Sequence, residues 1–290
     1  MRSVSEANRQ KQEKKQRNLA QAGRQVRIAG AFLLLIMLLL LSLIWSICSG
    51  SVSVPIMEFL QELREPKLRG MAWTIIWEIR LPRALAALIL GGALALSGYL
   101  LQTFFHNPIA GPFVLGISSG SKLLVALVMV GFLEWNITIN SGMLVAAAFA
   151  GALLSMLFVL LVARKMEQMA MLIVGGVMIG YICSAITDFV VTFASDADIV
   201  NLHNWSMGSF SGVTWGNVQV AACVVLPALA ASFCLSKPMA AYQLGESYAK
   251  SVGVAVRPFS MALVLLSSLL AACVTAFAGP ISFVGIAVPH

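Results

Sequence analysis

Apolar stretches of about twenty residues recur along most of the chain, and they constrain its fold more than any other feature. Each is long enough to cross the roughly 30 Å hydrocarbon core of a bilayer as an α-helix. In lipid every backbone amide needs a partner within the protein, and continuous apolar runs meet this need as helices. The sequence therefore predicts an all-α polytopic membrane protein. The seven predicted spans lie near residues 28–48, 84–105, 113–133, 142–163, 170–194, 217–235 and 259–277.

The composition excludes a water-soluble globule. Hydrophobic residues make up 59% of the chain and charged residues 11%, and the mean hydropathy is +0.90. The net charge of +7 does not indicate nucleic acid, because eight of the nineteen basic residues precede Ile28, directly before the first span. We expect a basic cytoplasmic tail over residues 1–27 and a transmembrane domain over residues 28–290.

The distribution of charge predicts the orientation. With the tail in the cytoplasm, the segments expected inside carry thirteen Lys and Arg residues against four Asp and Glu, and those expected outside carry five against seven. This agrees with the tendency of cytoplasmic loops to be positive. The chain is thus predicted to lie in the cytoplasmic membrane of a bacterium, with residues 236–258 as its longest inner loop.

Two arginines on the outer side are candidates for binding a partner. Arg80 and Arg83 flank Pro82 just before the second span. They could anchor the helix at the interface by snorkelling. A guanidinium is also suited to bidentate capture of a carboxylate, so a docking site for an acidic partner is the alternative.

Charged residues inside spans need an explanation, because they are costly in lipid. Lys122 lies in the third predicted span and Asp188 in the fifth. They could pair with each other, line a translocation pathway, or relay protons. The sequence leaves these alternatives open.

Four stretches together resemble the FecCD-type permeases of iron–siderophore, haem and vitamin B12 importers. They cover residues from about 75 to 290 in order, although Gly111 stands where the family usually has an acidic residue and Lys122 where it has a small or apolar one. The stretches are RLPRALAALILGGALALSGYLLQ with NPIAGPFVLGISSG, Asn204–Phe210 with Trp215, Leu244-Gly245-Glu246 with Ala249 and Val252-Gly253, and Gly279-Pro280-Ile281 to Pro289-His290.

The resemblance implies the helical bundle of the iron-chelate and vitamin B12 importer permeases, here truncated at its C-terminus, because the family continues beyond the Pro-His element. It implies an inner gate at Asn107 and Pro108, and docking of an extracytoplasmic solute-binding protein at Arg80 and Arg83. It also implies that Asp188 faces the pathway. In the loop 236–258, it implies ATPase-coupling contacts at Leu244, Gly245, Glu246, Ala249 and Gly253.

The same loop has a helical pattern of its own. Leu244, Tyr248 and Val252 would share one face of a short helix over Tyr242–Val252, which on spacing alone is an interfacial helix. Gly245 and Gly253 are expected to let the backbone turn sharply at its ends.

The predicted function is that of the membrane-spanning subunit of an ATP-driven importer of an iron–siderophore, haem or cobalamin chelate. The resemblance implies a second permease subunit, identical or paralogous, and a pair of ATPase subunits. No GxxxxGK[ST] motif occurs, so ATP is bound and hydrolysed by a separate subunit. We expect no catalytic residue and no cofactor in this chain, and no metal site, because His106, His203 and His290 are predicted on different sides of the membrane or far apart.

Two other function classes fit less of the sequence. An ion-gradient-driven secondary transporter would use Asp188 and Lys122 as coupling charges and would need no ATPase. An intramembrane enzyme would need a second catalytic group beside Asp188, which the pattern does not supply.

Overall fold

The computed structural model describes residues 2–50, 52, 57, 70–131, 140–165 and 169–289. The chain divides into two compact units, Met1–Arg80 and Leu81–His290, which are described separately. All regular elements in the described ranges are helices, which confirms the predicted all-α class. Six of these helices are long and apolar enough to cross a membrane.

The first unit contains α1 (Arg2–Cys48), α3 (Met71–Trp73) and the π-helix η2 (Thr74–Arg80). Helix α1 runs through the boundary expected near residue 27, because the tail is rich in Ala, Gln, Lys and Arg, which favour helix. Trp73 and Trp77 stack with ring centroids 5.2 Å apart.

The second unit contains the remaining helices. The predicted third span is divided, because Gly116 adopts a φ of +72° and ends a 3-10 turn before the next helix starts. The elements are α4 (Leu81–Phe105), η3 (Pro112–Leu115), α5 (Ile117–Gly131), α6 (Ser141–Lys165), α7 (Met169–Val191), α8 (Asp196–Ser206), α9 (Trp215–Cys234), α10 (Ser236–Gln243), α11 (Glu246–Ser251), α12 (Val256–Ala278) and α13 (Val284–Ala287).

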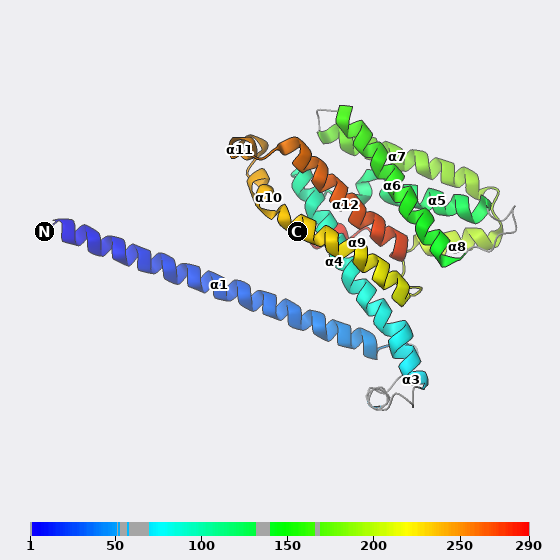
Figure 1. Ribbon diagram of the computed structural model, residues 1–290, viewed down its shortest axis with the longest axis horizontal. Helices are drawn as coiled ribbons and strands as arrows, with labels where there is room; N and C mark the ends of the chain where they lie inside the picture. Colours follow the sequence, from blue (N-terminus) through cyan, green and yellow to red (C-terminus); the bar gives the residue numbers. More distant parts are fainter. Residues whose placement is uncertain are drawn as a thin grey trace. The chain divides into compact units, whose positions relative to one another are not determined.

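Helix α12 is the centre of this unit. It is the most deeply buried of the long apolar helices and packs against α4, α5, α6 and α9 (Figure 1). Its buried residues are mostly small, including Ala271, Ala272 and Cys273, so neighbouring helices approach it closely.

A reciprocal pair of serines joins α12 to α4. The Ser97 hydroxyl donates to the carbonyl of Ser267 at 2.8 Å, and the Ser267 hydroxyl donates to the carbonyl of Ser97 at 2.8 Å. The two hydroxyl oxygens are 2.9 Å apart, and both side chains are fully buried. Hydrogen bonds between helices in a membrane protein are worth about 0.6–2 kcal/mol each, so this pair fixes the register of the two helices.

The short helix α13 packs against α4 at backbone contact. A Cβ added to Gly98 would lie 1.6 Å from the carbonyl oxygen of Gly285. The Gln102 side-chain amide donates to the carbonyl of Ile286 at 3.0 Å. Only glycine at position 98 leaves room for this approach.

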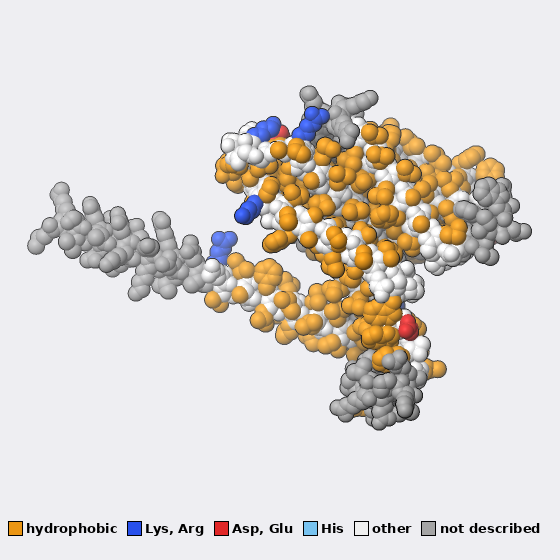
Figure 2. Space-filling view, viewed as in Figure 1, with side chains coloured by type: hydrophobic (Ala, Val, Ile, Leu, Met, Phe, Trp, Pro, Cys, Tyr) orange, Lys and Arg blue, Asp and Glu red, His pale blue; other side chains and the backbone are white. Residues whose placement is uncertain are grey.

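Glycine also sets the contact between α5 and α6. A Cβ on Gly151 would lie 2.2 Å from the carbonyl oxygen of Gly120, and the Ser121 hydroxyl donates to the carbonyl of Ala148 at 2.8 Å. Apolar side chains cover most of the visible flanks of the helices in Figure 2. Large exposed side chains on α7, such as Tyr181 and Phe189, belong to this apolar surface.

We predict that Gly98→Ala destabilises the fold, because the added methyl group meets backbone that has to move. Overpacking of this kind is worth about 1–3 kcal/mol. The thermal unfolding midpoint of the detergent-solubilised protein should fall. Gly92→Ala is the matched control in the same helix, because a Cβ there has nothing within 4 Å. Equal midpoints for the two variants would contradict the packing described here.

Candidate functional site: the turn after α4 and the helices α10 and α11

The predicted inner gate and the predicted coupling loop lie at the same end of the second unit. The turn His106–Gly111 follows α4, and α10 and α11 follow α9. Hydrogen bonds join the end of α4 to the end of α10. Lys and Arg side chains of this unit gather over α10, α11 and the start of α12 in Figure 2.

The turn after α4 is stabilised by its own side chains. The Asn107 side-chain oxygen accepts a hydrogen bond from the amide of Ile109 at 3.0 Å, and the amide of Asn107 donates to the carbonyl of Gln102 at 3.2 Å. Pro108 is exposed at the tip. An Asx-Pro turn of this kind ends the helix sharply.

His106 starts this turn in an unusual conformation. Its φ is +47°, the left-handed region that a histidine adopts more readily than most side chains. From there its Nε2 lies 3.1 Å from the carbonyl oxygen of Tyr242. Because a carbonyl only accepts, Nε2 carries the proton and donates. The Tyr242 carbonyl belongs to the last turn of α10, where carbonyls lack helical partners, so His106 caps α10.

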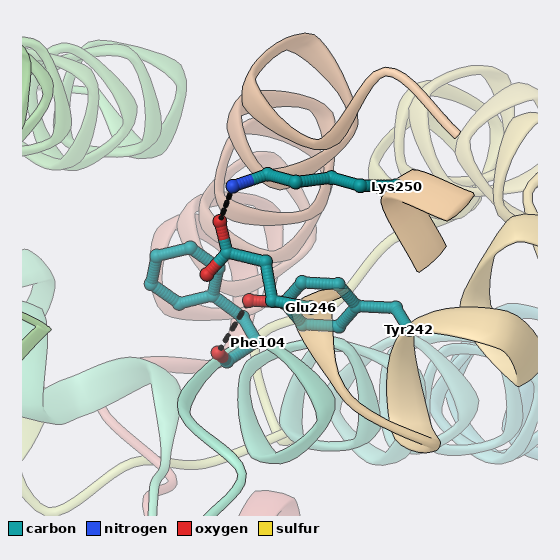
Figure 3. Close-up of polar contacts among 4 residues, drawn as sticks. All are labelled: Phe104, Tyr242, Glu246 and Lys250. Atoms are coloured by element: carbon teal, nitrogen blue, oxygen red, sulfur yellow. Dashed lines mark hydrogen bonds and ion pairs between the residues drawn. The ribbon is translucent and has the colours of Figure 1, made fainter. Parts of the chain in front are cut away.

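Tyr242 is the buried centre of this junction. Its side chain is 1% exposed and packs between the rings of His106 and Phe259, at centroid distances of 4.7 and 5.4 Å. Its hydroxyl points at the carbonyl of Phe104, 3.5 Å away (Figure 3). Burial raises the pKa of the Tyr242 phenol, a hydrogen bond with Ser260 opposes the shift, and the carboxylate of Glu246 adds to it. The hydroxyl therefore stays protonated and able to donate.

Gln243 makes the second connection. Its amide nitrogen donates to the Tyr99 hydroxyl at 3.1 Å and to the Thr103 hydroxyl at 3.4 Å, both on α4. A cleft of about 230 Å³ opens beside these contacts, and Asn107 and Pro108 line it together with Gln243. The candidate gate thus shares one cleft with the end of α10.

The loop 236–258 forms two helices, and the expectation of one helix over Tyr242–Val252 is wrong. Gly245 has a φ of +117°, which no helix accommodates, so α10 ends before it and α11 begins after it. The expected shared helical face is not formed either, because Leu244 lies in the turn before α11 and not in one helix with Tyr248. Leu244, Tyr248 and Val252 are 70, 48 and 53% exposed. Gly253, with a φ of +88°, makes the turn after α11.

The remaining predicted coupling residues differ in exposure. Glu246 is exposed at the start of α11 and pairs with Lys250 at 2.7 Å (Figure 3). Ala249 is fully buried and packs into the core beneath α11. Its prediction as a contact for a partner is therefore wrong, because its side chain reaches no surface; it supports α11 from below.

The structure corrects the role expected for Arg80. This side chain is only 8% exposed, and its guanidinium donates to the carbonyls of Ile47 at 2.8 Å and Cys48 at 3.0 Å, and to that of Val52. Arg80 therefore clamps the C-terminal end of α1, where carbonyls lack helical partners and a positive charge is favourable. Arg83, in the first turn of α4, is exposed and remains the candidate for docking.

The two charges within predicted spans do not pair with each other. Lys122 is half-buried on α5 and Asp188 is exposed on α7, and the described residues contain no ion pair between them. The alternative of mutual pairing is thus not found, and pathway lining stays a prediction for both.

Sequence reasoning missed the residues that join α4 to α10. From the sequence, His106 is considered only as a possible metal ligand, and no sequence pattern singles out Tyr99, Thr103 and Gln243. These residues lie about 140 positions apart in the chain, so no local pattern brings them together. The only local signal was a histidine directly before the Asn-Pro turn.

Comparisons with known proteins agree with this architecture. The model of the FecCD transport family matches residues 38–290. The vitamin B12 import system permease protein BtuC of Yersinia enterocolitica is 37% identical over 257 residues, which cover 88% of this chain and 73% of that protein. BtuC of Klebsiella pneumoniae is 36% identical over 257 residues, 88% of this chain and 74% of that protein.

A solved structure has the same fold. It is described as an inward-facing metal-chelate type ABC transporter, and it superposes with a TM-score of 0.76 at 28% identity, covering 88% of this chain and 78% of that chain. The chain belongs to the FecCD transport family and is of the same type as the permeases of ABC importers.

We predict that Arg80→Gln loosens the end of α1, because the shorter amide cannot reach all three carbonyls. Hydrogen bonds from a charged donor are worth about 1.5–3 kcal/mol, enough to raise the population of the open end more than tenfold. The rate at which Cys48 reacts with a maleimide, measured with the other cysteines replaced, should rise accordingly. Arg83→Gln is the matched control and should leave the rate unchanged; equal rates in both variants would refute the clamp.

Proposed function

We propose that this chain is the membrane-spanning subunit of an ATP-driven importer that carries an iron–siderophore or a related haem or cobalamin chelate into the cell. The observation that carries the proposal is the meeting of two elements at one end of the bundle. The exposed α10–α11 loop offers a surface to a partner, and it contacts the turn that contains Asn107 and Pro108. In such an arrangement, a movement of the partner displaces the α10–α11 loop, and the loop passes this displacement to the gate without a chemical reaction in the permease.

The ATPase pair is proposed to bind the tip of the α10–α11 loop. Leu244, Gly245 and Glu246 lie at the turn between the helices, and Gly253 lies at the turn after α11. Exposed apolar side chains beside charged ones are typical of a docking surface. Ala249 supports this surface from within and is not part of the contact.

The other partners follow from the same proposal. Arg83 is proposed to bind a carboxylate of an extracytoplasmic solute-binding protein. A second permease subunit, identical or paralogous, completes the pathway, and Asp188 and Lys122 are proposed to line it. The membrane is the cytoplasmic membrane of a bacterium, with the N-terminus in the cytoplasm; Lys237, Lys250 and Arg257 around α10 and α11, against the single acidic Glu246, support this orientation.

Uptake into proteoliposomes tests the function directly. The protein is reconstituted as its gene encodes it, together with the ATPase and binding protein of its own organism, and ATP is supplied on the side of the ATPase. We expect ATP-dependent uptake of cyanocobalamin or of an iron-loaded hydroxamate siderophore, and no uptake when ATP is omitted. Uptake driven by a proton or sodium gradient without ATPase would instead establish a secondary transporter and overturn the proposal.

We predict that Gly245→Val uncouples ATP hydrolysis from transport. Valine at a φ of +117° forces the turn between α10 and α11 to rearrange, while the pore helices are untouched. Glu246→Lys should act in the same direction, because it reverses the charge at the start of α11 and removes the pair with Lys250. Both variants should insert normally, and ATP-dependent uptake should fall by about tenfold or more if a central contact worth about 2 kcal/mol is lost.

Lys237→Gln on α10 serves as the control for a charge change outside the turn. Normal co-purification of the ATPase together with parental uptake in either turn variant would contradict the coupling assignment.

A further inference from the structure

The junction between α4 and α10 contains five side chains that the proposed function has not yet used. They share one property: each contacts the opposite helix or the turn that follows it. We name these contacts the α4–α10 clasp, which comprises Tyr99, Thr103, His106, Tyr242 and Gln243.

Internal hydrogen bonds hold the clasp together. Gln243 donates to two hydroxyls, His106 donates to the Tyr242 carbonyl, and the Tyr242 hydroxyl donates to the Phe104 carbonyl. These contacts connect the end of α4 to the end of α10.

The clasp connects the turn after α4 to the turn between α10 and α11. His106 holds the last turn of α10, and Asn107 and Pro108 follow it directly in the chain. The Tyr242 carbonyl accepts from His106 and also from the amide of Gly245, which starts the turn to α11. The Tyr242 carbonyl oxygen thus bonds both to the turn that contains the candidate gate and to the turn that leads to α11.

The Gly111 end of the turn His106–Gly111 is constrained by packing. A Cβ on Gly111 would lie 2.7 Å from a side-chain carbon of Ile286, so the end of the turn is pressed against α13. The turn His106–Gly111 is held at one end by α10 and at the other by α13. It therefore has to deform when α10 and α13 move relative to each other. Packed elements of this kind respond in discrete steps rather than continuously.

We propose that the α4–α10 clasp transmits displacement of the coupling helices to the Asn107–Pro108 turn, with His106 and Gln243 as the positioning residues. This inference rests on the proposed function, because it takes the α10–α11 loop as the contact with the ATPase. It adds the specific side chains through which motion of that loop reaches the gate.

A cysteine reporter in the gate turn tests the clasp. The five native cysteines are replaced with serine, Asn107→Cys is introduced, and this reporter is assembled with its ATPase. Maleimide labelling of position 107 is compared without nucleotide and with ATP plus vanadate. In the reporter with an intact clasp, nucleotide should change the labelling rate.

Gln243→Met removes both donated hydrogen bonds at nearly constant size. The nucleotide-dependent change should shrink by about two- to thirty-fold, the range that single contacts on a coupling route are worth. ATPase co-purification and ATP hydrolysis should persist, because the surface around Leu244 and Glu246 is intact. A merely structural role would instead reduce insertion or ATPase binding.

Gln243→Glu reverses the hydrogen bonds, because its carboxylate accepts from the hydroxyls of Tyr99 and Thr103. It should retain most of the nucleotide response. Ser251→Ala on α11 is the matched control, since that hydroxyl donates only within its own helix, and it should respond as the reporter does. If Gln243→Met does not assemble, Tyr99→Phe combined with Thr103→Val removes the same bonds from the α4 side and should give the same loss.

The outcomes separate the two proposals. A reporter that fails to co-purify with any ATPase overturns the proposed function, and the clasp with it. A reporter that binds the ATPase but shows the full nucleotide response in Gln243→Met and in the Tyr99→Phe, Thr103→Val variant overturns the clasp alone. An ATPase-bound reporter whose labelling never changes with nucleotide also overturns the clasp.

Discussion

The reciprocal hydrogen bonds between Ser97 and Ser267 are the interaction on which the second unit depends. They set the register of α4 against α12, and α12 is the helix against which α5, α6 and α9 also pack. Because lipid offers no competing hydrogen bonds and little hydrophobic drive between helices, register is set by such polar pairs and by close backbone contacts. A one-turn slip of α4 would displace Gly98 from Gly285 and His106 from α10 at the same time.

Much of the fold could be predicted from the sequence, because its physical causes are local. Apolar runs of sufficient length identify spans, and each predicted span has a helical counterpart among the described residues. Turn chemistry is also local: Gly245 and Gly253 adopt positive φ angles where sharp turns were predicted. The family followed from several motifs in order, and the comparison of residues 38–290 confirms it.

The rest depended on contacts between distant segments, which a single sequence does not contain. Whether Arg80 meets water or the end of α1 is decided by its contacts with Ile47 and Cys48, more than thirty positions earlier in the chain, and not by the residues around Arg80. The burial of Ala249 needs α12 beside α11. The α4–α10 clasp joins residues about 140 positions apart for the same reason.

The hydrogen bond from Gln102 to the carbonyl of Ile286 has a further consequence. Helix α13 is four residues long, so few of its carbonyls find a partner within it. In a lipid environment such groups cannot be left to water. The Gln102 side chain of α4 thus takes the place that a water molecule would have, because it donates to a carbonyl of α13. A side chain of this kind on a neighbouring helix is one way for a membrane protein to hold a short, interrupted helix in its interior.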